Sequence, residues 1–568
     1  MRLHILTIVF VFALPFHSLA ADSITWKVVG APDSLAENIE LHLKPLSEPT
    51  GNSEEKMAPI LERAVTKASR ALGYYHLSFQ WQRQNSTITI SVDPGEPIRW
   101  SNFDLTLQGP GASEPELQQT KNNPPFQPGE PINQGSYDEF KAGWLNQARS
   151  LGYRDARYTE KALKIDLKKR QADVVLALQT GDPYTVQAVR FYGSRVSDEL
   201  LNKLSLIKPG DRFQANALAN LYGQLLDTGY FQEISILPVK VADQQMAIEV
   251  NLIDAAKHSF TTGIGISTDT GPRVRLGWDR PLITSAGHQL HTEARVSKIE
   301  QRVSAEYRIP ITNPLNHYLS VDGGWRSKKV EDTETQIWET SFSHHAVHSG
   351  WQHVYKIGIE EEQYQQGNEP DETVFYVIPG SSWSRTQLKG DPHLPDGGHR
   401  LWLSLEASTE ALGSDTDFFR VVSGARWFTL LGKRHEVHAR LELGAVQAGT
   451  FDDVPPSRRF FTGGDQSIRG YDFESLAPKN DDGDLIGGQY LNVAGLEYRW
   501  RWKTRWFLAL FTDVGRAYND FNTNFNQGAG FGIHWQSPVG PIRFDIATPV
   551  DDAEHDGIRL HLTMGTAL

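Results

Sequence analysis

The chain has 568 residues, a formal net charge of −13 at pH 7 and no cysteine. Without cysteine it forms no disulfides and no thiolate metal sites, and its acidic balance argues against a nucleic-acid-binding surface, which needs clustered positive charge. A mean hydropathy of −0.43 is typical of a soluble multidomain protein. A transmembrane β-barrel gives a similar value, because its strands alternate lipid-facing and lumen-facing side chains.

The first twenty residues have the pattern of a secretory signal peptide. Met1-Arg2 is a short basic start, residues 3–16 are mostly apolar, and Ser18-Leu19-Ala20 is a small-residue cleavage site. The pattern predicts a mature chain that starts at Ala21. A transmembrane helix is the poorer alternative, because the apolar run is below roughly 18 residues and is broken by Pro15.

Residues 23–258 repeat one pattern three times. Leu72-Gly73-Tyr74, Leu151-Gly152-Tyr153 and Thr228-Gly229-Tyr230 recur at intervals of 79 and 77 residues. Each of these triplets ends a helical run and opens a strand. Such a period predicts three copies of one small domain.

The third copy predicts the order β-α-α-β-β, which is an α+β module with a three-stranded sheet backed by two helices. Its expected elements are a strand over 184–191, helices over 197–206 and 216–228, and strands over 231–240 and 245–253. For the second copy we expect a helix over 137–151 and strands over 153–159 and 172–179, and for the first a helix over 58–72.

Helical patterns stop near His258, and the 310 residues from Ser259 to Leu568 carry aromatic-rich alternating segments such as Phe507–Asp513. A membrane strand uses roughly 9 to 11 residues, so this part suffices for about 14 to 18 strands, usually an even number. A large soluble β-sandwich has the same period of two and remains open on periodicity alone. A closed barrel would remove the strand edges that an open sheet exposes.

One stretch in this half predicts neither strand nor helix: Arg459 to Tyr471, which reads R-F-F-T-G-G-D-Q-S-I-R-G-Y. Its glycines remove the steric bias that either element needs. The stretch resembles the (V/I)-R-G-(F/Y) loop of the outer-membrane protein-assembly barrels that carry periplasmic POTRA domains. In that family the loop folds back into the barrel and its arginine meets acidic residues of the inner wall. The resemblance therefore implies an inward-folded motif of Ile468, Arg469, Gly470 and Tyr471, with Asp513 and Glu497 as lumen partners of Arg469.

This resemblance covers nearly the whole mature chain. It identifies the three repeats as POTRA domains and implies a sixteen-stranded antiparallel transmembrane β-barrel. Three POTRA copies are similar to the TamA family, the outer-membrane subunits of the translocation and assembly module, which are related to BamA. The expected domains are a signal peptide (1–20), POTRA 1 (21–97), POTRA 2 (98–182), POTRA 3 (183–258) and the barrel (259–568).

The function that the resemblance implies is insertion and assembly of other proteins in the bacterial outer membrane, with the POTRA domains in the periplasm. The implied partners are outer-membrane lipid, a TamB-like inner-membrane-anchored protein, and unfolded outer-membrane protein and autotransporter clients. No cofactor is implied. The alternative is a polypeptide-transport pore of the two-partner-secretion type, in which the inward loop is a plug.

A barrel that inserts clients without nucleotide hydrolysis needs a place where backbone groups can pair with a new strand. We expect this lateral seam between the first barrel strand, 260–268, and the closing strand, 558–565. Gly263 and Gly265 would weaken the first strand, and Gly565 would let the last one bend inward. The alternative is that these glycines only ease tight curvature.

Patterns of catalysis and metal binding are weak. The sequence has no G-x-S-x-G, H-E-x-x-H or P-loop motif, so no enzyme activity is predicted. On a strand His344 and His348 would share a face, which supplies only two ligands, so no metal site is predicted. Gly528-Ala529-Gly530-Phe531-Gly532 lies on a strand pattern, where glycines at period two permit close backbone approach or a bend in the wall.

Overall fold

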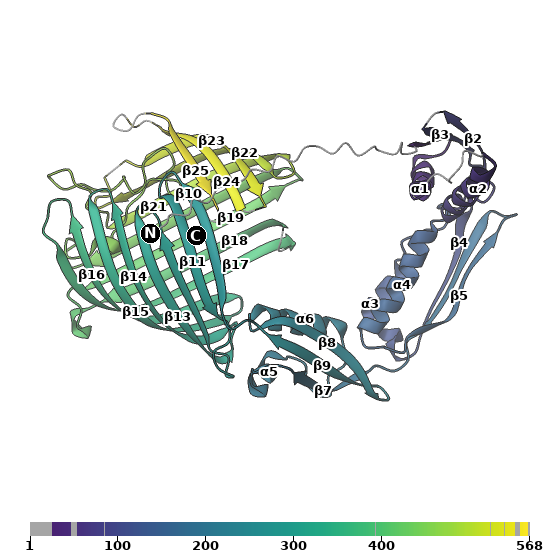
Figure 1. Ribbon diagram of the computed structural model, residues 1–568, viewed down its shortest axis with the longest axis horizontal. Coiled ribbons are helices and arrows are strands. Elements are labelled where there is room, and N and C mark those ends of the chain that lie inside the picture. Colours follow the sequence, from purple (N-terminus) through teal and green to yellow (C-terminus); the bar gives the residue numbers. More distant parts are fainter. Residues whose placement is uncertain are drawn as a thin grey trace, which may run out of the picture. The chain divides into compact units, whose positions relative to one another are not determined.

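The computed structural model describes residues 25–46, 54–84, 86–391, 394–522, 524–538, 540–550, 552 and 557–565. The predicted signal peptide lies outside the described residues. Figure 1 shows three small modules that mix helices and strands, followed by a β-barrel.

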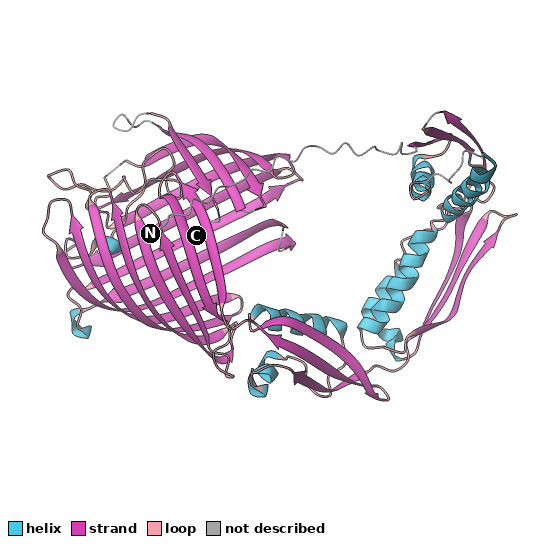
Figure 2. Cartoon of the chain, in the orientation of Figure 1, coloured by secondary structure: helices cyan, strands magenta, loops and turns pink. Residues whose placement is uncertain are grey.

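Each module has the predicted order β-α-α-β-β, and its last strand is central in a three-stranded sheet: β1-β3-β2, β4-β6-β5 and β7-β9-β8 (Figure 2). In the first two modules the first strand pairs in parallel with the central strand, as β1 does with β3, and the hairpin strands pair antiparallel. The first module consists of β1 (Thr25–Val29), α1 (Asp33–Leu43), α2 (Glu54–Ala71), β2 (Ser78–Gln84) and β3 (Thr87–Asp93). The second consists of β4 (Arg99–Gln108), η1 (Pro110–Ser113), α3 (Pro115–Asn122), α4 (Gln134–Ser150), β5 (Arg157–Asp166) and β6 (Gln171–Gln179). The third consists of β7 (Thr185–Tyr192), α5 (Asp198–Leu204), α6 (Ala215–Asp227), β8 (Phe231–Ala242) and β9 (Gln245–Asp254).

The core of the second module illustrates why these residues fold this way. The Asn133 side chain accepts a hydrogen bond from the Ser136 backbone N–H and so starts α4. Helix α4 then buries one face at helical spacing, while β6 buries alternate residues against it. The buried side chains are Tyr137, Phe140, Trp144 and Ala148 on the helix and Ala172, Val174, Leu176 and Leu178 on the strand.

The expected strand over 153–159 is wrong in its first half, since β5 begins only at Arg157. Gly152 has a φ of 100°, and the Tyr153 backbone N–H donates to the Ala148 carbonyl oxygen across the end of α4. The left-handed backbone conformation of Gly152 ends α4 and keeps Tyr153 in the core, where it is 2% exposed. The strand therefore begins several residues later than expected.

The C-terminal half is a closed barrel of sixteen strands in the described ranges, each antiparallel to the next, which confirms the expected barrel and strand number. The strands are β10 (Ser259–Ser267), β11 (Gly271–Arg280), β12 (Gln289–Val296), β13 (Glu300–Asn313), β14 (His317–Val330), β15 (Thr333–His348), β16 (Trp351–Gln366), β17 (Glu372–Asp391), β18 (Leu394–Ser408), β19 (Phe418–Leu431), β20 (His435–Ala448), β21 (Tyr490–Lys503), β22 (Trp506–Tyr518), β23 (Asn526–Ser537), β24 (Gly540–Val550) and β25 (Arg559–Met564).

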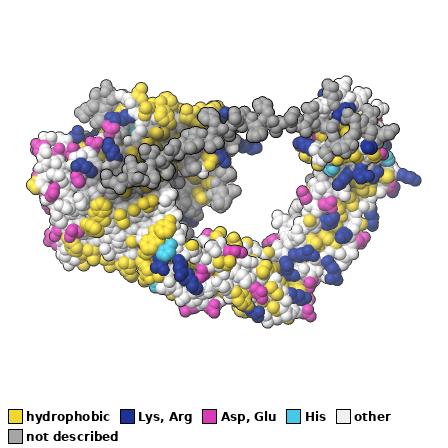
Figure 3. Space-filling view, in the orientation of Figure 1, with side chains coloured by type: hydrophobic (Ala, Val, Ile, Leu, Met, Phe, Trp, Pro, Cys, Tyr) yellow, Lys and Arg dark blue, Asp and Glu magenta, His cyan; other side chains and the backbone are white. Residues whose placement is uncertain are grey.

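Alternation along each strand separates an apolar outer face from the lumen. On β22, Trp506, Leu508 and Leu510 are exposed, while Phe507 and Phe511 are buried. Hydrophobic side chains gather on the outer wall of the barrel in Figure 3. Among the helices in the described ranges, none is both long and apolar enough to cross a membrane.

The third module is fastened to the barrel through the turn between β11 and β12. The Tyr230 hydroxyl donates to the Gly287 carbonyl oxygen at 2.6 Å, and the Ser197 backbone N–H donates to the Ser285 carbonyl oxygen at 2.8 Å. Gly287 has a φ of 82°, and a Cβ there would lie 2.5 Å from Leu200. Tyr230 closes the third repeat triplet, so this triplet is a docking element as well as a helix ending.

Candidate functional site: an inward loop and a short seam

Residues 449–489, between β20 and β21, form a long loop that packs against the inner wall of the barrel. Apolar side chains of the loop join apolar side chains of five wall strands in one core, which fixes the loop by burial rather than by regular secondary structure. The loop contributes Val454, Phe460, Ile468, Tyr471 and Leu476, and the wall contributes Tyr376, Ile378, Phe418, Val446, Leu491, Val493 and Ala517.

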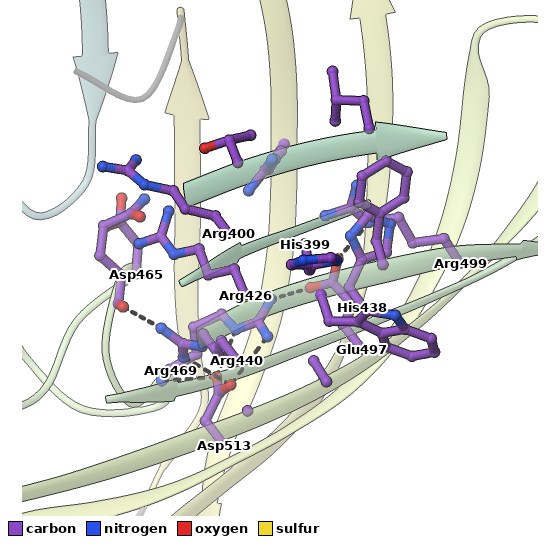
Figure 4. A pocket seen from close by; sticks show the side chains of 18 residues that line it. His399, Arg400, Arg426, His438, Arg440, Asp465, Arg469, Glu497, Arg499 and Asp513 are labelled. Atoms are coloured by element: carbon purple, nitrogen blue, oxygen red, sulfur yellow. Dashed lines mark hydrogen bonds and ion pairs between the residues drawn. The ribbon is translucent and has the colours of Figure 1, made fainter. Parts of the chain in front are cut away.

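Arg469 is the centre of the polar contacts of this loop (Figure 4). Its Nε donates to Asp513 Oδ2 at 2.7 Å, and its Nη1 donates to Glu497 Oε2 at 2.6 Å. Its backbone N–H also donates to Asp513 Oδ2, at 3.3 Å. Arg469 is only 7% exposed and Asp513 is fully buried. The guanidinium thus meets the two acids that the family resemblance implies.

The guanidinium of Arg469 also lies over an aromatic ring, with its central carbon 3.4 Å from the centroid of the Phe511 ring. Carboxylates at its edges and an aromatic ring on its face together restrict both the position and the orientation of this planar cation. Breaking a buried pair leaves an uncompensated charge and typically costs about 3 to 5 kcal/mol. This arrangement therefore holds the loop firmly.

Sequence reasoning missed several partners that complete the network. Arg440 donates to Asp513 Oδ1 at 2.8 Å and to the carbonyl oxygens of Gln466 and Ser467. Asp545 lies 3.4 Å from Arg469 Nη1 and pairs with His534 at 2.8 Å. These residues lie on strands with no distinctive local motif around Arg440 or His534, so only three-dimensional contact identifies them.

Glycine lets the loop backbone lie directly on the wall. A Cβ at Gly528 would stand 1.8 Å from the Arg469 carbonyl oxygen, and a Cβ at Gly470 would stand 2.9 Å from the backbone of Thr548. Gly470 has a φ of 101°, and its N–H donates to His561 Nε2 at 3.0 Å. Of the two readings of the glycine-rich strand, close backbone approach is the one seen at Gly528.

The seam between the first and last barrel strands is short. Among the described residues, β10 and β25 pair at two positions, Ile266↔Met564 and Ser267↔Thr563. By contrast, β10 pairs with β11 at nine positions, and β24 pairs with β25 at six. One further backbone bond crosses the seam, from the Thr268 N–H to the Leu562 carbonyl oxygen at 3.0 Å.

The three predicted seam glycines line one cavity of about 250 Å³ beside this pairing, but they differ in what they permit. A Cβ at Gly265 would lie 2.9 Å from the Met564 carbonyl oxygen, so close approach of the strands requires a glycine there. Gly565 has a φ of 100° and adopts the bend that ends β25. Gly263 has only an ordinary contact, with Arg275, and no steric reason for a glycine is present.

Asp465, from the same loop, joins the two seam strands. Its Oδ2 accepts hydrogen bonds from Ser267 Oγ on β10 and from Thr563 Oγ1 on β25, each at 2.9 Å. These two hydroxyls belong to one of the two paired positions of the seam. The Asp465 N–H also donates to the carboxylate of Asp269, just after β10. The loop that carries Arg469 thus also bridges the seam.

Among the described residues, no group of three or more histidine and carboxylate side chains is placed to hold a metal ion.

Comparison with protein families gives three matches. The model described as Omp85 superfamily domain matches residues 244–567, which is more than half of the chain. The model described as POTRA domain TamA domain 1 matches residues 25–94. A third, described as Surface antigen variable number repeat, matches residues 184–252.

Individual relatives are assembly factors of the outer membrane. The outer membrane protein assembly factor BamA of Nitratidesulfovibrio vulgaris is 36% identical over 166 residues, which are 27% of this chain and only 21% of that protein. BamA of Neisseria meningitidis serogroup B is 20% identical over 601 aligned residues, covering 90% of this chain and 73% of that protein. Among solved structures, BamA from Haemophilus ducreyi lacking POTRA domains 1–3 superposes with a TM-score of 0.68 at 16% identity. That match covers 82% of this chain and 99% of the other, and it shows the same fold.

Proposed function

Since this chain belongs to the Omp85 superfamily, whose members act in outer-membrane protein assembly and transport, we propose that it is an assembly factor of the TamA type. Its barrel lies in the outer membrane and its POTRA domains lie in the periplasm. In this proposal the protein inserts unfolded outer-membrane proteins, autotransporters among them, together with a TamB-like inner-membrane-anchored partner. The family match at residues 25–94 and the three POTRA-type modules support the TamA type over BamA.

The observation that carries the proposal is that β10 and β25 pair at only two positions in the part of the chain that the structure describes. Each ladder hydrogen bond contributes only about 0.5 to 1.5 kcal/mol net, so a seam with so few can open thermally while the fourteen-strand remainder of the wall stays paired. An opened β10 would offer free N–H and C=O groups to a client strand, which is β-augmentation. Residues 259–265 of β10 would be available first, because Ile266 and Ser267 hold the pairing.

In this proposal the inward loop stabilises the closed form of the seam. Arg469 fixes the loop to β21 and β22 through Glu497 and Asp513, and Asp465 of the same loop holds one hydroxyl from each seam strand. Displacement of the loop would therefore weaken the seam, and a stable loop would return the barrel to its closed form. The loop core includes residues of five wall strands, which explains why the rest of the wall would stay intact.

A disulfide across the seam tests the proposal. The natural chain has no cysteine, so Ile266→Cys with Met564→Cys introduces one possible bond at a paired position. We expect the oxidised double variant to stop client assembly in reconstituted vesicles and the reduced form to recover it. The matched control is Phe342→Cys with Ile357→Cys, a paired, outward-facing apolar position between β15 and β16. This control should assemble clients whether oxidised or reduced; undiminished assembly by the oxidised seam variant would contradict the proposal.

The alternative, a polypeptide-transport pore, predicts a different path for the client. A client that threads the lumen would crosslink to lumen side chains such as Arg400, whereas a client at the seam would crosslink to Gly263 or Ile264 of β10. Photo-crosslinkers placed at these positions therefore separate the two functions. The apolar core between the loop and the wall favours the seam, because it fills part of the lumen.

A further inference from the structure

Three arginines stand in one row across neighbouring strands of the lumen wall. Arg400 on β18 is directly opposite Arg426 on β19, and Arg426 is directly opposite Arg440 on β20. Like charges at directly opposite positions of antiparallel strands destabilise a sheet. The next position in the row is Gly495, and a Cβ there would lie 2.5 Å from both Arg440 Nε and Asp513 Oδ1. Because Gly495 has no side chain, Arg440 can reach across it to Asp513. Among the described residues, Arg440 is the one arginine of the row that pairs with a carboxylate.

This row lines a lumen cavity of about 330 Å³ (Figure 4). Six arginines and three carboxylates contribute to its wall, so positive charge is in excess. They are Arg400, Arg426, Arg440, Arg469, Arg499 and Arg543, with Asp465, Glu497 and Asp513. All three carboxylates already have partners. Glu497 pairs with Arg469 and Arg499, Asp513 pairs with Arg469 and Arg440, and Asp465 accepts hydrogen bonds from two hydroxyls of the seam.

Three of the six guanidiniums have no anionic partner. Within the described residues, neither hydrogen bonds nor ion pairs are formed by Arg400, Arg426 or Arg543. The carboxylates of Glu442 and Asp545 also face this part of the lumen, yet neither forms an ion pair with these three arginines. Guanidiniums that form no ion pair, in a cavity whose lining carries more cations than anions, are the arrangement expected of an anion-binding site.

Two of these arginines are also held in place. Arg400 and Arg426 both lie over the ring of Trp402, each with its guanidinium carbon 5.8 Å from the ring centroid. The ring has room because Gly424 is its cross-strand neighbour, where a Cβ would lie 2.1 Å from the indole. Contact with one indole restrains both side chains while leaving their N–H groups free for a ligand.

We propose that this cavity, which we call the lumen arginine site, binds a phosphate-bearing anion. Phosphate and guanidinium match as forked acceptor and donor, and the phosphate oxygens outnumber those of a single carboxylate, so they satisfy more of the free N–H groups. The bound group belongs to a soluble phosphate compound or to the headgroup of a phosphorylated lipid. Both sources present the same chemistry to the three free guanidiniums.

The test is a calorimetric titration of the full chain, in nonionic detergent, with inorganic pyrophosphate. We expect saturable binding with one site per chain. Binding should weaken by at least about tenfold in Arg400→Gln with Arg426→Gln, because charge-assisted hydrogen bonds are lost. Arg426→Lys keeps the charge but removes the fork and should weaken binding less. The matched control is Arg326→Gln, since Arg326 also faces the lumen but lines a separate cavity; it should bind as the natural chain does.

The same titration in lipid nanodiscs separates the two sources. If phosphatidic acid in the nanodisc competes with pyrophosphate, the site takes a lipid headgroup; if it does not, the site takes a soluble phosphate. Either result supports the site. Absence of saturable binding to a natural chain that migrates as a folded barrel would overturn the proposal. So would equal weakening in Arg326→Gln, or tighter binding of an acidic peptide than of pyrophosphate.

Discussion

The backbone of Gly528 on β23 lies against the carbonyl of Arg469 in the loop, so closely that a Cβ would stand 1.8 Å from the carbonyl oxygen. This contact is between backbones and leaves no room for adjustment by a flexible side chain. We therefore expect Gly528→Ala to displace the loop and to lower the temperature at which the barrel unfolds. Heat-modifiable migration on a gel measures this. Gly323→Ala on β14, where the nearest atom would lie 3.9 Å from the new Cβ, is the control and should change little.

Arg469→Ala should destabilise the loop by up to about 3 to 5 kcal/mol, because it removes the cation that Asp513 and Glu497 share and leaves each buried carboxylate with one remaining arginine partner, Arg440 for Asp513 and Arg499 for Glu497. Proteases should then cut between residues 449 and 489, and client assembly should fall. Arg469→Lys should recover part of the stability, since it keeps the charge without the fork. Arg434→Ala, in an exposed turn between β19 and β20, is the control. Unchanged protease resistance in Arg469→Ala would show that the apolar core alone holds the loop.

Asp465→Ala should loosen the seam without displacing the whole loop, because Asp465 accepts one hydrogen bond from each seam strand. Amide hydrogen exchange followed by mass spectrometry should show faster exchange in residues 259–267 and 559–564 and unchanged exchange in β14 to β16. The control is Asp481→Ala, an exposed carboxylate of the same loop. Equal exchange rates in Asp465→Ala and the natural chain would refute a role of the loop in closing the seam.

The junction between the second and third modules should weaken in acid. Arg212 Nη1 donates to Glu114 Oε1 at 2.6 Å, and this bond lowers the pKa of Glu114 below its ordinary value of 4.5. A carboxylate with a lowered folded-state pKa contributes stability that is present above the ordinary value and is lost as pH falls through the lowered one. Thermal unfolding followed by helical circular dichroism, at several pH values, should show this loss. Glu114→Gln should reduce it, whereas Glu116→Gln, at an exposed position nearby, should not.

Deletion of residues 22–94 should abolish capture of the periplasmic partner but leave an inserted barrel. The third module is fastened to the barrel through Tyr230 and Gly287, and we expect the first module, which is the farthest from the barrel along the chain, to contact the partner. Co-purification from crosslinked membranes measures capture. A truncated protein that retained its partner at the natural level would assign partner binding to another module.

The repeat period, the β-α-α-β-β order and the change to alternating strands could all be predicted from the sequence, because each follows from local periodicity. The strand at 153–159 was placed too early, since the left-handed turn at Gly152 carries Tyr153 into the core before the strand starts. The first and last barrel strands were expected within one residue of β10 and β25. Strand number came from resemblance, because alternation alone does not decide how a sheet closes.

Some residues of the candidate site could likewise be predicted from the sequence, and others could not. Arg469 and its two acids lie in recognisable motifs, so the sequence could name them. Arg440, His534 and Asp465 could not be named, because their roles depend on strands that are far apart in the chain. A row such as Arg400, Arg426 and Arg440 depends on strand register, which the sequence does not give at single-residue precision.

The contacts of the inward loop also set the order in which this barrel can mature. The Gly470 N–H bonds to His561, 91 residues later in the chain, and Arg469 depends on strands β21, β22 and β24. The loop is therefore synthesised before its binding surface is complete. Contacts of such long sequence separation carry a large loop-closure cost and form late. The apolar residues of the loop therefore stay exposed until the last strands pair, and we expect pairing of these strands to be the late step in the folding of this barrel.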